Sequence, residues 1–171
     1  MTKFVAFLRG INVGGHRKVP MAELRAICPG TDVQSYIASG NLTFEAEGDS
    51  DEHATSLAAR IKETFGFDVP VLVLDENQMR AVLMTCPFPH DAGKLVHAYL
   101  CYGPPALDQA GVATLKTPTE QVTVIDRTVW LYAPDGFGRS KLAAKFERLI
   151  GVEATARNLN TMIKMVDMLD G

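Results

Sequence analysis

The first half of the chain alternates short apolar runs with amphipathic stretches. Phe4–Leu8 is a continuous apolar run with the length of a buried strand. Pro20 suits a first helical position, and Met21, Leu24 and Ile27 recur after it at helical spacing. Further strands are expected at residues 33–38, 42–45 and 71–74.

Turn and cap residues delimit these elements. The segment Ser39–Asn41 separates two strands, and its Gly-Asn pair is a signal for a tight hairpin. Asp49 followed by Glu52 has the spacing of a capping box and opens a helix, which Gly66 closes. Another helix follows Asp75. The resulting order is β-α-β-β-α-β with an appended helix, the split βαβ pattern of ferredoxin-like folds.

The second half repeats this order. Strands are expected at residues 95–101, 122–125 and 128–132, and helices within residues 106–115, 140–150 and 160–169. Gly66 and Gly151 correspond at an offset of 85 residues. The same offset places residues 74–84, which hold the helix appended to the first half, on residues 159–169, which hold the last helix. Ala154–Asn158 then stands where another fourth strand would be. The pattern predicts an α+β tandem pair of ferredoxin-like (βαββαβ) subdomains, residues 1–86 and 87–171, the second degenerate, with an appended helix after each. The alternative is a chance match, because such patterns recur often.

Composition places the chain among ordinary globular proteins. It has 171 residues, 47% hydrophobic and 22% charged. Its longest apolar runs, such as Val69–Leu74, are far too short to span a bilayer, so no membrane partner is expected. Arg9 interrupts the first apolar stretch, so we expect no signal peptide. Three cysteines without a CxxC pair favour reduced thiols and a cytoplasmic location, and argue against a zinc cage.

Charge is distributed unevenly. The net charge is −3, yet residues 1–30 carry five basic residues against one acid, and residues 137–171 carry six against four. An acidic total makes nucleic acid an improbable partner, because such binding requires neutralising phosphates. Two basic ends still allow a local cationic site. The sequence indicates no oligomeric state.

Polar residues in two loops are expected to meet. The first and second strands of a split βαβ sheet run toward the same end, so the loop after one neighbours the turn after the other. Guanidinium, amide, hydroxyl and glycine N–H groups there suit a phosphate or carboxylate, with the helix at Pro20 adding its positive end. The alternative is that the asparagines cap turns and the arginine joins strand ends. The candidate ligand-binding residues in these loops are Arg9, Asn12, Gly14, Gly15, Ser39, Gly40 and Asn41.

Two further polar clusters lie near the C-terminus. Ser140 has the position of a helix cap, and Arg139 and Lys141 flank the positive helix end, which is unfavourable unless an anion lies nearby. Arg157 and Asn158 belong to a segment with more polar groups than capping explains. We expect these five residues to join the first set in one composite site.

Known cofactor and catalytic patterns are missing. Neither a Walker A loop nor GxGxxG occurs, so no cofactor is indicated. His97, Tyr99 and Cys101 share one strand face, where a Cys–His pair is conceivable but core packing is commoner. His90 and Asp91 lie together in a loop, but no third ligand that would complete a metal site can be placed. Trp130 could stack on a base, although packing is the commoner role of such a residue.

Four separated motifs carry a family resemblance. They are LRGINVGG followed by VPMAELR, YIxSGN, GRSK and TxRNxNT, at residues 8–25, 36–41, 138–141 and 155–161. Together they resemble the bacterial domain-of-unknown-function family 1697. The resemblance implies two ferredoxin-like halves and no assigned reaction. Leu159 departs from the aromatic residue, usually Trp, that the family pattern shows there.

Our leading hypothesis is a small anionic ligand, a nucleotide or a phosphorylated metabolite, bound at the composite polar site. An enzyme of unassigned reaction using the same site is the first alternative. A strongly shifted histidine pKa within a cleft would favour it. The second alternative is an RNA-binding or assembly module, which a fully buried Trp130 would weaken.

Overall fold

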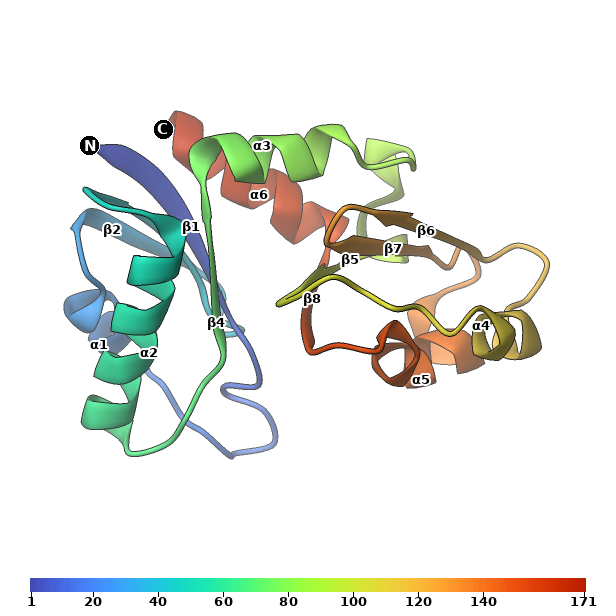
Figure 1. Cartoon of the computed structure of the whole chain (residues 1–171), viewed down its shortest axis with the longest axis horizontal. Helices are drawn as coiled ribbons and strands as arrows, with labels where there is room; N and C mark the ends of the chain where they lie inside the picture. The colour runs from blue at the N-terminus through green and yellow to red at the C-terminus, as the bar shows by residue number, and fades with distance from the viewer. The chain divides into compact units, whose positions relative to one another are not determined.

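Two four-stranded antiparallel sheets with associated helices make up the computed structural model, which describes all 171 residues (Figure 1). The chain is a mixed α+β protein. It divides into two compact units: unit 1 is Met1–Ala81 with Met165–Gly171, and unit 2 is Val82–Lys164. None of the helices is both long and apolar enough to cross a membrane.

Unit 1 has the strand order β2-β3-β1-β4, and every neighbouring pair is antiparallel. Its elements are β1 (Thr2–Leu8), α1 (Met21–Ile27), β2 (Thr31–Tyr36), β3 (Asn41–Ala46), α2 (Ser50–Phe65), β4 (Val71–Asp75) and the start of α3 (Glu76–Met84). The central strand β1 is buried from Phe4 to Leu8, which explains its unbroken apolar run.

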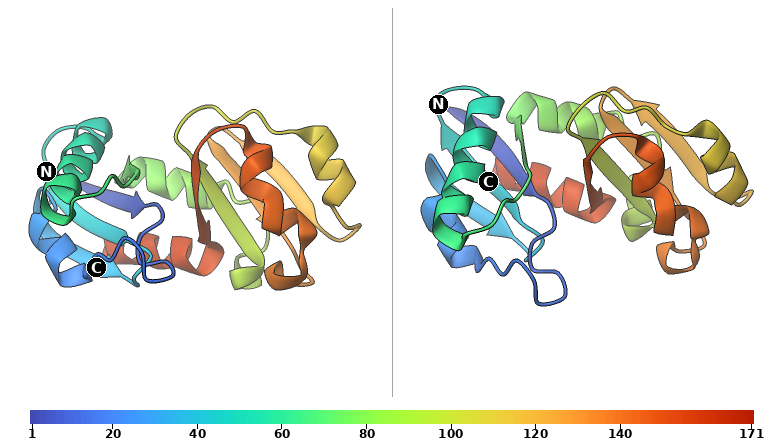
Figure 2. Two further views of the ribbon diagram at one scale, coloured as in Figure 1. Left: turned by 90° about the horizontal axis from the view of Figure 1, so that it is seen from below. Right: turned by 60° about the horizontal axis from the view of Figure 1, so that its bottom comes forward.

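Helices α1 and α2 cover one face of this sheet (Figure 2). Leu24 of α1 and Leu57 and Ile61 of α2 are fully buried against Phe4 and its neighbours on that face. The ends of α2 form as the sequence predicts. Asp49 accepts a hydrogen bond from the Glu52 N–H at 2.9 Å, and Gly66 closes the helix with a φ of 86°.

Unit 2 has the equivalent strand order β6-β7-β5-β8, again antiparallel throughout. Its elements are the end of α3, η1 (His90–Leu95), β5 (Val96–Cys101), α4 (Gln109–Leu115), β6 (Gln121–Ile125), β7 (Thr128–Tyr132), η2 (Phe137–Arg139), α5 (Lys141–Ile150), β8 (Ala154–Asn158) and the start of α6 (Leu159–Asp170). Tyr99, Val129 and Leu131 form its core with Phe146 and Ile150 of α5. Ala154–Asn158 is a complete strand paired with β5.

Two local details differ from the expected ones. Pro20 precedes α1 as its cap, because its ψ of 134° is extended. The β2–β3 connection is the four-residue segment Ile37–Gly40, and Asn41 already pairs within β3. That residues 1–86 and 87–171 are separate domains stays a prediction.

Candidate functional site

The loop after β1 forms a small hairpin. Asn12 donates its backbone N–H to the Arg17 carbonyl at 3.0 Å, and His16 donates to Val13 at 3.0 Å. The two corner residues, Gly14 and Gly15, have φ values of 58° and 77°. Positive φ at both corners is the type I′ geometry that favours Gly-Gly, so the turn itself requires these glycines. We call residues Asn12–Lys18 the cationic hairpin.

Asn12 fixes this hairpin to the rest of unit 1. Its amide nitrogen donates to the carbonyls of Val19 at 3.0 Å and Ala38 at 2.7 Å. Its amide oxygen accepts from the Val19 N–H at 2.8 Å. Because Ala38 lies in the β2–β3 turn, one side chain joins the two loops that the sequence predicts to be neighbours. The Leu8 N–H also donates to the Gly40 carbonyl at 2.9 Å.

The β2–β3 turn is tightly held and partly strained. The buried Asn41 amide donates to the Tyr36 carbonyl at 2.8 Å and to the Ser39 hydroxyl at 3.0 Å. Gly40 has a φ of 91°, and a Cβ there would lie 2.8 Å from the Leu8 Cβ. Ile37 has a φ of 50° although it is β-branched and 52% exposed. The side chains of Asn12 and Asn41 therefore hold the two loops by hydrogen bonds to backbone and hydroxyl groups, which agrees with the alternative in which the asparagines cap turns.

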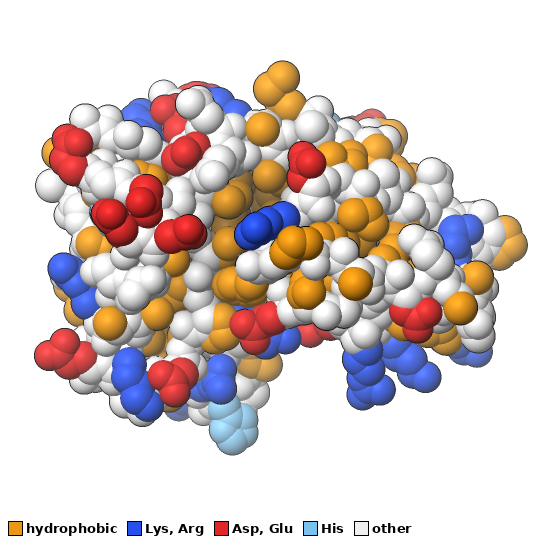
Figure 3. Space-filling model, viewed as in Figure 1, with side chains coloured by type: hydrophobic (Ala, Val, Ile, Leu, Met, Phe, Trp, Pro, Cys, Tyr) orange, Lys and Arg blue, Asp and Glu red, His pale blue; other side chains and the backbone are white.

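Cationic side chains dominate the exposed surface of the hairpin. His16, Arg17 and Lys18 are exposed and form no ion pair or side-chain hydrogen bond, and no acid occurs before Glu23. Figure 3 shows a histidine beside Lys and Arg side chains at the lower edge, where Figure 1 draws the loop between β1 and α1. Arg9 is partly buried and has interaction partners. Arg17 and Lys18 are therefore the unpaired cations that the hairpin exposes to solvent.

In unit 2, the Arg139–Lys141 segment begins α5. The Ser140 hydroxyl accepts a hydrogen bond from the Ala143 N–H at 2.9 Å, so the expected helix cap is present. Arg139 and Lys141 are exposed on either side of it. The Ser140 hydroxyl is therefore occupied in capping, and the two cations remain at the solvent surface.

Arg157 and Asn158 lie at the end of β8. The Arg157 guanidinium is buried and donates to the Thr155 hydroxyl at 2.8 Å and to the Ala156 carbonyl at 2.9 Å. Burial lowers the pKa of Arg157 to about 10. Asn158 accepts from the Thr161 N–H at 2.9 Å and so caps α6. Their assembly with the residues of unit 1 into one site stays a prediction.

The shared face of β5 is a packed core. The ring centroids of His97 and Phe137 are 3.7 Å apart, and those of Tyr99 and Phe146 are 4.8 Å apart, with the rings of both pairs tilted relative to each other. Burial lowers the pKa of His97 to about 4, which keeps its ring neutral near pH 7. Burial also raises the pKa of the Cys101 thiol to about 11, so the nucleophilic thiolate is disfavoured. Both shifts follow from burial of the two side chains.

Trp130 bears on the RNA-binding alternative. Its side chain is fully buried, and its indole Nε1 has no hydrogen-bond partner. A buried ring cannot stack on a base, so this observation weakens that alternative.

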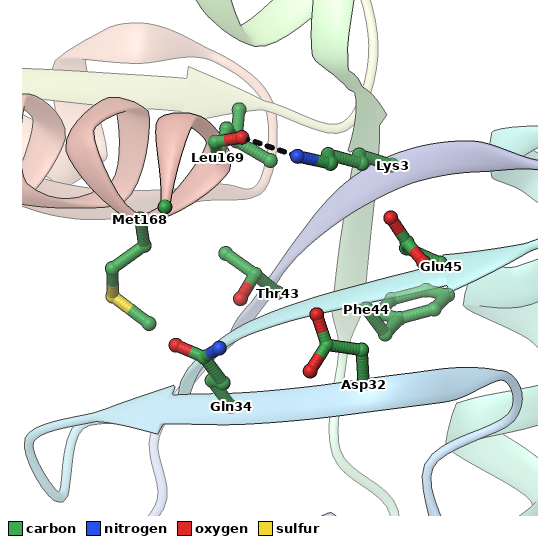
Figure 4. Close-up of a pocket in the computed structure, with 9 residues that line it drawn as sticks. Lys3, Asp32, Gln34, Thr43, Phe44, Glu45, Met168 and Leu169 are labelled. Carbon is green, nitrogen blue, oxygen red and sulfur yellow. Dashed lines mark hydrogen bonds between the residues drawn. The ribbon is translucent and has the colours of Figure 1, made fainter.

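Two cavities of unit 1 are lined by residues outside the candidate set. Lys3, Asp32, Thr43 and Glu45 border a pocket whose lysine donates to the Leu169 carbonyl at 2.7 Å (Figure 4). With a volume of about 10 Å³, it suits a single water molecule. A larger groove of about 400 Å³ is lined by acids near the start of α2, where Figure 3 shows red side chains gathered. No cluster of three or more potential metal-ligating side chains occurs.

Comparison with known proteins identifies the family. A family model described as "Protein of unknown function (DUF1697)" matches residues 1–130. The chain belongs to the DUF1697 family. The matched range includes the cationic hairpin and the β2–β3 turn, whereas the Gly138–Lys141 and Thr155–Thr161 motifs of this DUF1697 chain lie beyond it.

A solved structure supports the fold. The chain is similar to the conserved bacterial protein SP0830 from Streptococcus pneumoniae, with 24% identity and a TM-score of 0.76. The similarity covers 100% of this DUF1697 chain and 99% of the other. No curated protein matches the chain.

Sequence reasoning missed three exposed features of the loops. Arg17 and Lys18 directly follow Gly14, Gly15 and His16 in the sequence but stand outside the expected ligand set, and their basic residue types beside the glycines are the signal that indicates them. Ile37 gave no signal, since positive φ is rare for a β-branched residue.

Proposed function

We propose that the protein binds a small anionic ligand, a nucleotide or a phosphorylated metabolite, whose anionic group is held by the cationic hairpin of unit 1. The observation that carries the proposal is the pair of adjacent exposed cations, Arg17 and Lys18, which have no acidic partner and lie next to the exposed imidazole of His16 in the sequence. Charge-assisted hydrogen bonds from Arg and Lys to phosphate are about twice as strong as neutral ones.

The anchoring of the hairpin supports a recognition role. The Asn12 side chain makes three hydrogen bonds, two across to Val19 and one to Ala38, so the loop is held in one conformation. A loop ordered before binding loses less conformational entropy when the ligand arrives. In this proposal Asn12 and Asn41 position the two loops, whereas Arg17 and Lys18 contact the anion.

Strain in the neighbouring turn adds a second support. Ile37 adjoins Ala38, to which Asn12 is bonded, and it holds an αL conformation that costs about 1–2 kcal/mol. Backbone strain concentrates at functional segments. An exposed apolar side chain on the turn to which the hairpin is hydrogen-bonded suits a ligand that combines an anionic group with an apolar portion, such as a nucleotide base.

The finer fold and the location belong to this proposal. We interpret each unit as ferredoxin-like, because both have the second, third, first and fourth strands in that spatial order. A cytoplasmic location is supported by three free cysteines, of which two are buried.

Thermal-shift and calorimetric titrations test the proposal. Inorganic phosphate, nucleoside mono-, di- and triphosphates and a panel of sugar phosphates are each added to the wild type and to an Arg17→Ala/Lys18→Ala variant. At least one phosphate compound should raise the melting temperature of the wild type and lose at least tenfold in affinity for the variant.

The matched control is Lys145→Ala/Arg148→Ala, which removes the same two residue types from exposed positions on α5. It should bind as the wild type does, because general charge loss is the same in both variants. The proposal fails if no phosphate compound binds the wild type, or if the two double variants lose affinity equally.

A further inference from the structure

The edge strand β6 of the second sheet has no charge, no proline and no bulge, three features that protect exposed edges. It lies outermost in the order β6-β7-β5-β8 and pairs only with β7 (Figure 1). Its sequence, Gln121-Val122-Thr123-Val124-Ile125, has no charge, proline or glycine, and three of its five residues are β-branched and apolar. Val124 is 42% exposed.

The first sheet shows how this protein protects an edge elsewhere. Strand β2 occupies the equivalent outer position, and its register with β3 shifts between Thr31 and Gln34. Asp32 lies within that irregularity, is exposed and has a φ of 50°. A bulge with an edge charge prevents the addition of another strand. Strand β6 pairs with β7 in unbroken register and has neither feature.

The turn after β6 determines which backbone groups face outward. Only Asp126 and Arg127 separate Ile125 from its partner Thr128, and Asp126 has a positive φ of 52°. The pair that closes a two-residue hairpin is hydrogen-bonded, and such pairs alternate along the ladder. The N–H and C=O groups of Thr123 therefore face β7, whereas those of Val122 and Val124 face the open edge.

We propose that β6 pairs antiparallel with β6 of a second copy of this chain, about a two-fold axis at Thr123. This register places Val122 opposite Val124 of the second copy, so their outward groups form four interchain hydrogen bonds. Thr123 then faces Thr123 of the second copy in a non-hydrogen-bonded pair, where Thr–Thr contacts are favourable.

The chemistry of the strand selects a second copy as the occupant. In the Thr123-centred register an apolar side chain opposes an apolar one at each valine pair, and no charges oppose each other within Gln121–Ile125. The match ends beyond Ile125, where Asp126 would face Glu120 of the second copy. An isologous interface requires self-complementarity of this kind about its axis. The inference is independent of the proposed anion site.

Sedimentation equilibrium over a range of protein concentrations tests the pairing. The wild type should show a concentration-dependent mass that approaches twice its 18.6 kDa. Val124→Lys places a charge on the edge strand and should weaken self-association at least tenfold. In the proposed register the lysine of each copy would lie opposite the apolar Val122 of the other copy. The matched control, Gln34→Lys on edge strand β2, should associate as the wild type does.

A cysteine variant tests the register directly and does not depend on the lysine variant folding. In a Cys86→Ser background, Thr123→Cys should form a disulfide-linked dimer under mild oxidation, because facing residues of a non-hydrogen-bonded pair have Cα atoms about 4.5 Å apart. Gln121→Cys should not, since it faces Ile125. A monomeric wild type, an unaffected Val124→Lys dimer or equal crosslinking of both cysteine variants overturns the proposal.

Discussion

Acidification should destabilise the protein through His97. This residue lies on β5 with its ring against Phe137, and its Nδ1 is buried without a hydrogen-bond partner. A protonated imidazolium would need a partner for both ring N–H groups. Burial accordingly lowers the pKa of His97 to about 4, from 6.5 in the unfolded chain.

The sign and size of the effect follow from linkage. Between these two pKa values the unfolded chain binds a proton that the folded chain does not, so the free energy of unfolding decreases as the pH falls. The contribution of neutral His97 to the free energy of unfolding is fully present above pH 6.5 and is lost progressively as the pH falls toward 4. The shift corresponds to at most about 3 kcal/mol, which partial solvent screening of this half-buried ring reduces to about 1–2 kcal/mol.

Urea unfolding of the wild type and His97→Phe, from about pH 4 to about pH 7.5, measures the contribution. Phenylalanine keeps the ring packing but does not titrate, and all other titrating groups cancel in the difference between the two proteins. That difference should change in favour of His97→Phe by about 1–2 kcal/mol on acidification. A difference that is constant with pH, or that changes in favour of the wild type, refutes the assignment.

Two substitutions test the loops of unit 1. Asn12→Ala should lower the free energy of unfolding by about 3 kcal/mol, because three hydrogen bonds are lost. Asn77 is exposed, so the control variant Asn77→Ala should change the free energy of unfolding little. An equal effect of both in urea unfolding would contradict the anchoring role. Ile37→Asn should raise stability by about 1 kcal/mol, since asparagine tolerates positive φ, whereas Val13→Asn, exposed with a negative φ, should not. Calorimetric melting temperatures compare them, and a destabilised Ile37→Asn would show that packing holds the isoleucine.

Helix ends and buried strands could be predicted from the sequence because their signals are local. Asp49 and Glu52 lie three positions apart, and their hydrogen bond forms as that spacing predicts. Gly66 and Gly151 both end helices with positive φ, at 86° and 82°. The continuous apolar run of β1 corresponds to a central strand with neighbours on both sides. Each of these features depends on residues within a single turn or strand.

The β2–β3 connection could not be predicted in detail because its conformation depends on distant residues. Gly40-Asn41 has the composition of a tight turn, yet Asn41 is recruited into β3, where it pairs with Phe7 of β1. Extending β3 by this residue buries the asparagine amide, which is satisfied by Tyr36 and Ser39. Ile37 then takes the positive φ that the sequence assigns to glycine or asparagine.

The candidate site shows the same limit of local reasoning, with a consequence for the chemistry. An exposed asparagine in a glycine-containing loop suits either a ligand or a backbone carbonyl, and its residue type does not distinguish them. Asn12 meets Ala38, a partner 26 residues away, which only the folded chain brings within reach. Once the amides hold the loops, the cations remain as the groups able to select a ligand. Affinity at this hairpin should therefore depend on charge and salt concentration, as expected for a phosphate group rather than a neutral polar ligand.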